Sequence, residues 1–365
     1  MRRIALDVNS VVPFFIQGWT TGIGRTTLEL VQAMDQLENL PVEVVLFSQN
    51  MKGSGARNLG THFKARHLFL PFRDKWNRLL SYTPTREWLT GCDLFHIPHN
   101  FDHVHHPEKT ILTLHDALFF VHPEEKLNHS FAQKHYPKLA RRCKHIITCS
   151  QSSKRDIMQY MDIPEEKITV IPWGVNNVIF HPAIPAENKR RYFLSVSCSA
   201  GRKNTMAVVR AFAQFASGNH PEHRLILVWD NPSEETLIFI QRQHIVPLVD
   251  IIPSVDNQQL ADLYAHATAT FFPSRYEGFG LPVLESMACG TPVVTCPNSA
   301  LPEVGGDAAL YVLPDDIDSM ARLMESFENA SANLVLLREK CLRQASRFSW
   351  LRCAQETINC YTCSL

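Results

Sequence analysis

Two glutamates and a glycine loop are the residues of this sequence best suited to chemistry. Glu277 and Glu285 lie eight residues apart and enclose the loop from Gly278 to Gly280. Glycines let a backbone approach a ligand closely, and a helix that starts behind such a loop favours a phosphate or pyrophosphate. Carboxylates repel phosphate, so the glutamates should bind hydroxyl groups on either side of it. A nucleotide sugar has this order of groups: sugar, diphosphate and ribose.

Each glutamate taken alone has a plain structural interpretation. Glu285 would then be a helix acid favoured by the helix dipole, and Glu277 would be a solvated loop residue. Together with both glycines, Pro282 and Gly290, the pair favours the ligand-binding interpretation.

The residues around this loop predict the elements that hold it. Ala267–Phe272 is a short apolar run of β-branched and aromatic residues, which is typical of a buried strand. Pro282 suits the start of a helix and Gly290 its end, and Thr291–Thr295 predicts the next strand. A strand–loop–helix–strand order is the repeating unit of a parallel sheet.

A second loop of the same kind carries two cations. Arg191–Ser197 predicts a strand and Thr205–Ala216 a helix, with Arg202, Lys203 and Asn204 between them. Cations at a helix start oppose its dipole, which disfavours a simple basic cap. They could instead neutralise a diphosphate as it becomes a leaving group.

The first half of the chain also alternates strands with helices, which predicts a doubly wound α/β sheet. The expected strands and helices are Ile4–Val8, Thr26–Leu37 (helix), Val42–Phe47, Leu94–Ile97, Thr110–Leu114, Phe131–Arg142 (helix) and His145–Cys149. His115 and Asp116 follow one of these strands, at the edge where open parallel sheets bind ligands. Asp116 could orient a sugar or cap the next segment, and a lone strand-end histidine is more often structural.

Length and composition limit the class of protein. At 365 residues, two domains are expected. Thirty-six basic and 36 acidic residues give no net charge, which disfavours a general nucleic-acid binder. The ten cysteines are scattered, with Cys360 and Cys363 at CxxC spacing, and no secretory segment follows Met1, so a cytosolic enzyme with reduced thiols is expected. No apolar run is long enough to span a membrane.

Three further motifs each allow both a functional and a purely structural interpretation. Gly22 and Gly24 lie in a loop that lacks the third glycine of a dinucleotide fingerprint, so they are weak evidence for NAD. The aromatic and basic stretch 69–82 could contact an anionic membrane surface or form an ordinary helix with a basic face, and both remain open. The histidines of 102–106 could bind a metal, although a solvated loop is favoured.

The motifs Ser274–Glu285, Ala288–Val294 and Ser299–Glu303 together resemble glycosyltransferase family 4. That family comprises retaining enzymes with nucleotide-sugar donors and the GT-B fold, in which two Rossmann-like doubly wound α/β domains face each other across a cleft. The resemblance implies an acceptor-side domain over 1–184 and a donor domain over 185–346. It also implies a helix over 347–365 that crosses back onto the first domain.

The resemblance assigns roles to residues of this sequence. The residues implied as catalytic are His115, Glu277, Arg202 and Lys203. The residues implied as donor-binding are Gly22, Gly24, Asp116, Asn204, Gly278, Phe279, Gly280, Leu281 and Glu285. The family's usual arginine lies nearer Cys198, and its glycine is missing at Ser197, so this sequence departs from the family around its basic loop.

We therefore expect a metal-independent, retaining hexosyltransferase without a cofactor. UDP-glucose is the favoured donor and GDP-mannose the alternative, with a growing polysaccharide or a lipid-linked saccharide as acceptor. The motif Asp316-Ile-Asp318 predicts a helix N-cap rather than a metal site. The alternatives are a nucleotide-sugar epimerase, a sugar phosphorylase or a non-catalytic nucleotide-sugar binding protein. The expected location is the cytoplasm, with peripheral contact at the inner face of the membrane through 69–82 as an option.

Overall fold

The computed structural model divides the chain into two compact units. One unit consists of 1–174 and 349–365, and the other of 175–348. The chain thus passes between units after Gly174 and after Phe348, whereas the sequence analysis placed the boundaries after residues 184 and 346. The residues that the structure describes are 1–12, 22–50, 59–69, 83–99, 104, 106–125, 129–183, 191–197, 200–218, 222–329 and 333–365.

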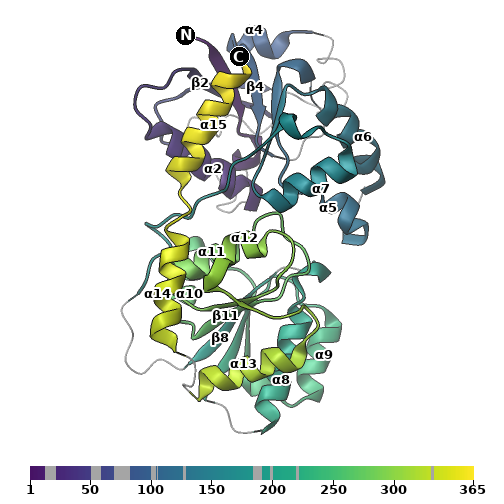
Figure 1. Ribbon diagram of the computed structural model, residues 1–365, viewed down its shortest axis with the longest axis vertical. Coiled ribbons are helices and arrows are strands. Elements are labelled where there is room, and N and C mark those ends of the chain that lie inside the picture. Colours follow the sequence, from purple (N-terminus) through teal and green to yellow (C-terminus); the bar gives the residue numbers. More distant parts are fainter. Residues whose placement is uncertain are drawn as a thin grey trace. The chain divides into compact units, whose positions relative to one another are not determined.

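The first unit is built on a seven-stranded parallel sheet with the order β3-β2-β1-β4-β5-β6-β7 (Figure 1). Its strands are β1 (Arg3–Asp7), β2 (Glu43–Asn50), β3 (Lys64–Phe69), β4 (Leu94–Ile97), β5 (Thr110–Thr113), β6 (His145–Thr148) and β7 (Ile168–Val170). Its helices are η1 (Asn9–Val11), α2 (Gly22–Asp35), α4 (Thr85–Thr90), η3 (Pro107–Lys109), α5 (Leu118–Val121), η4 (Pro123–Glu125), α6 (His129–Arg142), α7 (Gln151–Met161), η5 (Glu165–Lys167) and α15 (Trp350–Ser364).

Both faces of this sheet are covered, because successive strand residues point to opposite faces. Ile4 and Leu6 of β1 join a core with α2 and α15. Ala5 lies in a different cluster with Phe47 and Phe95. Strands buried on both faces explain why these segments are continuous apolar runs in the sequence rather than alternating ones.

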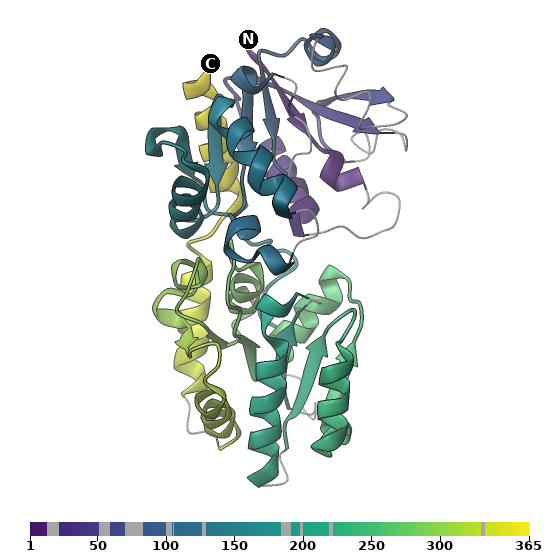
Figure 2. The same ribbon diagram turned by 90° about the vertical axis from the view of Figure 1, so that its right-hand side faces the viewer.

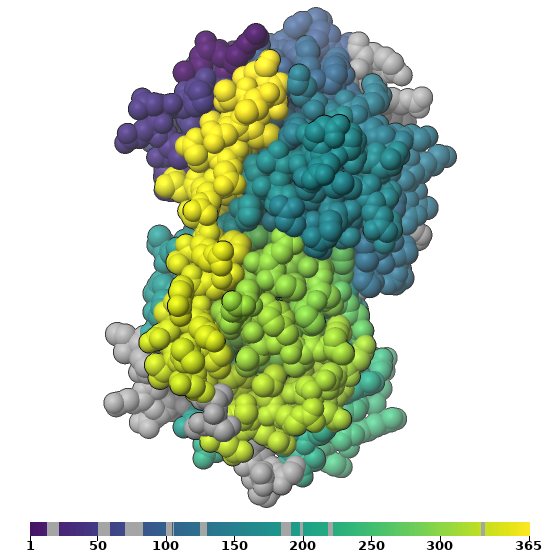
Figure 3. Space-filling view, in the orientation of Figure 1, coloured from purple at the N-terminus to yellow at the C-terminus, as the bar shows by residue number. Residues whose placement is uncertain are grey.

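Helix α15 closes the first unit from the far end of the chain. It packs against α2, and the two helices lie side by side (Figure 1, Figure 2). Figure 3 shows α15 in yellow on the surface of this unit. Trp350 is buried in the core of the unit. At Gly174 an added Cβ would lie 2.0 Å from the Trp350 backbone nitrogen, so only glycine permits this approach.

The second unit has a six-stranded parallel sheet with the order β10-β9-β8-β11-β12-β13. Its strands are β8 (Tyr192–Val196), β9 (Arg224–Val228), β10 (Val249–Ile252), β11 (Ala269–Phe272), β12 (Val293–Thr295) and β13 (Leu310–Tyr311). Its helices are η6 (Gly201–Lys203), α8 (Thr205–Gly218), α9 (Glu234–Arg242), η7 (Val246–Leu248), α10 (Asn257–His266), α11 (Leu281–Ala288), α12 (Leu301–Gly305), η8 (Gly306–Ala308), α13 (Ile317–Glu328) and α14 (Leu334–Ala345).

The helices of the second unit form two groups. Helix α8 packs against α9 and α13, and α11 packs against α10, α12 and α14. Strands β8 and β11 lie between these groups in Figure 1. The two-layer cover is the doubly wound α/β arrangement that the alternating strands and helices predicted.

Several expectations need correction or fall outside the described residues. Gly22 and Gly24 were expected in a loop, but both lie in the first turn of α2. The edge strand β3 was not predicted, because its residues alternate between exposed and half-buried and include Lys64 and Arg66. Of the stretch 69–82 only Phe69 is described, and most of 102–106 lies outside the described residues.

Two composition-based expectations can be compared with the described part of the chain. No described cysteine forms a disulfide, and all of them except Cys363 are buried. Burial raises the pKa of several thiols, that of Cys143 to about 12 for example. Among the described helices, none combines the length and the apolar composition that crossing a bilayer requires.

Candidate functional site

The basic residues of the second unit lie in the connection between β8 and α8. Arg202 and Lys203 end the single turn η6, and Asn204 follows it with a left-handed backbone (φ 58°). The Asn204 side chain donates hydrogen bonds to the carbonyl groups of Pro273 and Pro314, at 3.2 and 2.6 Å. Asparagine tolerates this backbone conformation better than most residues. Asn204 therefore fixes the turn that presents the two cations.

Glu277 lies in the connection that follows β11, the strand adjacent to β8. The Lys203 ammonium lies 2.7 Å from Glu277 Oε1, and Arg202 Nη1 lies 3.9 Å from the same oxygen. Ser274 Oγ donates a further hydrogen bond to Oε1 at 2.7 Å. The three charged side chains are 10 to 16% exposed. The structure thus brings together three of the four residues implied as catalytic.

The charges of this cluster favour an anionic ligand. Burial alone raises the pKa of Glu277, but the Lys203 and Arg202 charges, with hydrogen bonds from Lys203 and Ser274, hold that pKa below its ordinary value. One ionised carboxylate beside two cations leaves a net positive charge. Lys203 also lies 4.7 Å from the ring centre of Phe272, the last residue of β11, which adds a cation–π contact.

The glycine loop leads directly into α11. Gly280 is the N-cap residue, with φ 112°, and Pro282 lies in the first turn. An added Cβ at Gly280 would lie 3.0 Å from Leu301 Cδ2 of α12. Glycine is needed here both for its backbone conformation and for the close approach. Pro282 has no N–H and the Val283 N–H donates to the Gly280 carbonyl at 3.0 Å, so Leu281 carries the first-turn amide that has no acceptor within the helix.

The neighbouring chain segment supports the loop. The Glu277 backbone N–H donates to Ser299 Oγ at 3.0 Å, and the Ala300 N–H donates to the Glu277 carbonyl at 3.4 Å. Phe279 is buried and packs edge-on against Phe348, with ring centres 5.8 Å apart. The side chain of Phe279 therefore supports the loop from inside the unit.

Glu285, the second glutamate, is 3% exposed and lies on α11 one turn beyond the glycine loop. Its charge is one reason, after burial, why the pKa of Cys289 is raised to about 12. Leu281, the first residue of α11, is half-buried, and Gly278 is buried. The residues expected to bind the donor in this unit are thus collected around one helix start.

Sequence reasoning did not single out the residues that support the cluster. The Arg275 backbone N–H donates to the Arg202 carbonyl at 2.7 Å. The Arg275 guanidinium forms a two-point ion pair with the Asp315 carboxylate, at 2.8 and 2.5 Å. The contacts of Ser274 and Ser299 with Glu277 were not predicted, although both serines belong to the motifs named above. Asp316 is the N-cap of α13, where it accepts from the Ser319 N–H at 2.9 Å, and this confirms the predicted cap.

The described residues contain no group of three or more histidine, cysteine, aspartate or glutamate side chains that could hold a metal ion. The charged groups of the cluster itself are those of Lys203, Arg202 and Glu277, with Glu285 on the following helix.

In the first unit, His115 follows β5 and is buried. Its Nε2 donates to the Pro98 carbonyl at 3.2 Å, and burial, together with the charge of His99, lowers its pKa to about 4. Its ring packs against Trp173 and borders a cavity of about 20 Å³, roughly the space of one water molecule. Asp116 accepts from the Leu118 N–H at 3.0 Å, which is the capping option of its two expected roles.

Two family models match consecutive parts of the chain. Residues 20–177 match Glycosyltransferase Family 4, and residues 179–347 match Glycosyl transferases group 1. The chain belongs to glycosyltransferase family 4. Its two parallel sheets are the two Rossmann-like halves of the GT-B fold.

Several relatives of this glycosyltransferase are O-antigen mannosyltransferases. O-antigen chain mannosyltransferase B of Escherichia coli is 28% identical over 93% of this chain and 96% of that protein. O-antigen chain mannosyltransferase RfbU of Salmonella typhimurium is 32% identical over 60% of each chain. Among solved structures, Anabaena Alr3699/HepE in complex with UDP and glucose has a TM-score of 0.74 at 16% identity, covering 99% of this chain and 100% of that one. This last likeness shows the fold alone.

Family membership gives the charged cluster a chemical context. A glycosyltransferase must bind a sugar donor and stabilise a leaving group on which negative charge develops. Two cations and a helix start within the second unit are suited to that task. The cluster is therefore the candidate donor site of this family member.

Proposed function

We propose that this glycosyltransferase moves a mannosyl group from a nucleotide-activated mannose, GDP-mannose, to a polysaccharide or lipid-linked saccharide of the bacterial surface. The Lys203–Glu277 ion pair, with Arg202 beside it, is the observation that carries the proposal. Mannose is favoured over other hexoses because the relatives at 28 and 32% identity are mannosyltransferases. UDP-glucose, which the sequence favoured, becomes the second donor to test.

Each group of the cluster has a proposed role. Arg202, Lys203 and the Leu281 amide at the start of α11 bind the diphosphate. Glu277 binds hydroxyls of the transferred sugar, and Glu285 binds hydroxyls of the ribose. Because the Glu277 carboxylate already forms an ion pair with the Lys203 ammonium at 2.7 Å, a bound diphosphate would share that cation with the carboxylate. This arrangement keeps the buried lysine paired before the donor binds.

We further propose that transfer retains the anomeric configuration and needs no metal. The bond from the sugar C1 to the diphosphate oxygen breaks, and the acceptor oxygen bonds to C1 on the same face. The acceptor hydroxyl proton passes to the leaving diphosphate. Arg202 and Lys203 offset the charge that develops on that diphosphate, which is the task that a divalent cation performs in other transferases.

The test combines binding with turnover. Thermal unfolding is followed with UDP, GDP and their glucose and mannose conjugates, in the presence of EDTA, because a ligand that binds the folded state raises the midpoint. Radiolabelled GDP-mannose is then incubated with octyl α-D-mannopyranoside, and the product anomer is read by NMR. The proposal requires a guanine-specific shift and an α-linked product. A uridine-specific shift would move the donor to UDP-glucose.

The alternative activities give different products in the same assay. An epimerase would alter the donor without any acceptor, a phosphorylase would require inorganic phosphate, and a binding protein would shift the midpoint without turnover. Strict dependence on manganese would contradict the metal-independent step. The cytoplasmic location and a contact with the membrane remain proposals, to be tested by cell fractionation.

A further inference from the structure

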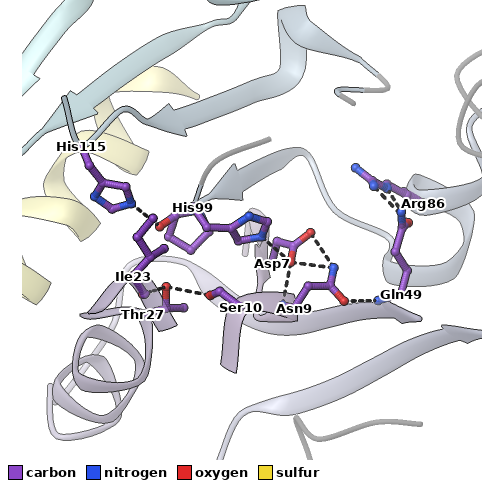
Figure 4. A network of polar contacts seen from close by, with 10 residues as sticks. Asp7, Asn9, Ser10, Ile23, Thr27, Gln49, Arg86, His99 and His115 are labelled. Carbon is purple, nitrogen blue, oxygen red and sulfur yellow. Dashed lines mark hydrogen bonds and ion pairs between the residues drawn. The ribbon is translucent and has the colours of Figure 1, made fainter. Parts of the chain in front are cut away.

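A continuous hydrogen-bonded chain of polar side chains crosses one edge of the first unit (Figure 4). His99 Nε2 lies 3.0 Å from Asp7 Oδ1, and the same oxygen accepts from the Asn9 backbone N–H and side-chain amide, both at 2.8 Å. Asn9 Oδ1 accepts from the Gln49 N–H at 2.8 Å. Gln49 Oε1 then accepts from Arg86 at 3.0 and 3.2 Å.

These side chains come from the carboxyl ends of three neighbouring strands. Asp7 is the last residue of β1, Gln49 lies at the end of β2, and His99 comes two residues after β4. Strand β1 pairs with both β2 and β4. In open parallel sheets, ligands bind beyond this edge. The chain of side chains therefore lies where a ligand of the first unit would be expected.

The Asp7–His99 pair is costly as a purely structural element. Asp7 is 6% exposed, and its burial opposes ionisation. The contacts with His99, the charge of Arg86 and the Asn9 amide nevertheless hold the pKa of Asp7 below its ordinary value. Replacing a buried ion pair with apolar residues is often neutral or stabilising. An ionised carboxylate kept at a ligand-binding edge therefore favours a functional role.

The chemistry of the network suits a polyhydroxyl ligand. Carboxylate, amide, guanidinium and imidazole groups supply planar donors and acceptors, which match the hydroxyl groups of a sugar. A buried carboxylate disfavours a diphosphate, and the candidate donor site of the second unit already has cations for one. An uncharged saccharide is thus the better ligand for this edge.

We propose that His99 contacts a hydroxyl group of the saccharide acceptor and that Asp7 positions the His99 ring for this contact. The proposal rests on the proposed glycosyl transfer, for which it names an acceptor-recognition residue. Ionised Asp7 accepts from Nε2 and so fixes the orientation of the ring with a proton on that nitrogen, as carboxylate–histidine pairs do in other sites. Asn9 holds the same carboxylate through its backbone N–H and its side-chain amide, which both donate to Oδ1.

The experiment compares three variants by steady-state kinetics with GDP-mannose and octyl α-D-mannopyranoside. His99→Gln retains an N–H donor for Asp7 and loses the ring, His99→Ala loses both, and Asp7→Asn loses the charge. We expect His99→Gln and His99→Ala to raise the acceptor KM at least tenfold and Asp7→Asn to raise it by a smaller factor. The donor KM and the nucleotide-induced shift of the unfolding midpoint should stay within twofold of the wild-type values.

A matched control lies at the amino ends of the strands in the same sheet. His145 is the first residue of β6, and its Nε2 bonds to Thr169 Oγ1 at 2.8 Å. His145→Gln should leave the acceptor KM unchanged. If the acceptor KM of His99→Gln equals that of the wild type, the ring serves only to pair with Asp7 and the proposal is overturned. A lower unfolding midpoint without a change in acceptor KM overturns it as well.

A binding measurement separates this proposal from the proposed donor chemistry. Saturation-transfer NMR with methyl α-D-mannopyranoside needs neither donor nor turnover. A signal that is strong for wild type and for His145→Gln but lost in His99→Gln supports the saccharide site, even where no nucleotide binds. Equal signals in all three proteins overturn it, whereas an absent nucleotide shift overturns only the donor assignment.

Discussion

Lys203 and Glu277 form a 2.7 Å ion pair between the connections that follow two adjacent strands, β8 and β11. Both side chains are more than four-fifths buried, so neither charge is well solvated. Removing one partner of such a pair leaves the other uncompensated. Removing the Glu277 charge therefore leaves the buried Lys203 ammonium without its anionic partner.

Glu277→Gln should separate donor binding from transfer. The substitution keeps the shape of the side chain and removes the charge that competes with a diphosphate for Lys203, so nucleotide binding should be equal or tighter. Turnover should fall by about a hundredfold, because a contact to the reacting sugar is lost. Initial rates and nucleotide titrations measure both effects. Exposed Glu325 on α13 is the control, and equal, negligible effects of both substitutions would sink the assignment.

Glu285→Gln should weaken the binding of all nucleotides together. A hydroxyl that donates to a charged carboxylate contributes roughly 1.5–3 kcal/mol, so affinity should fall about tenfold or more. Because the ribose is common to free nucleotides and nucleotide sugars, GDP and GDP-mannose should lose affinity by the same factor. Calorimetric titration of both ligands measures this. A loss confined to GDP-mannose would assign Glu285 to the sugar instead.

Gly280→Ala should destabilise the second unit. A side chain at φ 112° is strained, and its Cβ would press against Leu301 at 3.0 Å, so a cost of about 1–3 kcal/mol is expected. Gly22→Ala is the matched control for stability, because nothing lies within 4 Å of its added Cβ and alanine favours a helix. Thermal unfolding should show a lower midpoint only for Gly280→Ala. Similar midpoints for the two variants would contradict the role of this glycine.

Asn204 offers a graded test of how the basic turn is held. Asn204→Gly keeps the left-handed backbone accessible but loses the side-chain hydrogen bonds to Pro273 and Pro314, worth about 1 kcal/mol each. Asn204→Ala loses the bonds and adds backbone strain. The unfolding midpoint should therefore fall in the order asparagine, glycine, alanine. Nucleotide affinity should fall in both variants, and an unchanged affinity would show that Lys203 and Arg202 are positioned without this residue.

Acid should destabilise the first unit through two buried, neutral histidines. Burial, their largest common cause, lowers the pKa of His115 to about 4 and that of His96 to about 3, from an ordinary value of 6.5. As the pH falls below 6.5, the unfolded chain binds protons that the folded chain does not. The unfolding free energy should then fall by up to roughly 1.4 kcal/mol per pH unit for each histidine, until the folded pKa is reached.

His115→Gln tests this dependence, because glutamine does not titrate. Unfolding midpoints measured from pH 7 to pH 4.5 should decline less steeply for the variant than for wild type. Parallel slopes for wild type and His115→Gln would show that His115 is already protonated in the folded chain.

Most strands and the donor loop could be predicted from the sequence because their signals are local. The apolar runs of Leu94–Ile97 and Ala267–Phe272 predicted strands that the structure confirms, the first with the same bounds. The spacing of Gly280, Pro282 and Gly290 predicted a helix that the structure places at Leu281–Ala288. The exposed edge strand β3 lacks such an apolar signal and was missed.

The role predicted for His115 depends on orientation, which no local pattern contains. Its position after β5 was foreseen, but the bond from Nε2 to the Pro98 carbonyl depends on the segment after β4, a neighbouring strand. A contact of His115 with the transferred sugar stays a prediction. Donor binding by Gly22 and Gly24 also stays a prediction, because these glycines lie within α2 and not in the expected loop.

The succession of most strands and helices along the chain, the glycine loop with its two glutamates, and the family of these motifs could all be predicted from the residues. Which side chains meet depends on the folded sheet. Lys203 reaches Glu277 because β8 lies beside β11, and His99 reaches Asp7 because β4 lies beside β1. Strand order in a parallel sheet is set by crossover connections and by packing over the whole unit. Contacts between distant segments therefore follow from the folded sheet and not from any local pattern of residues.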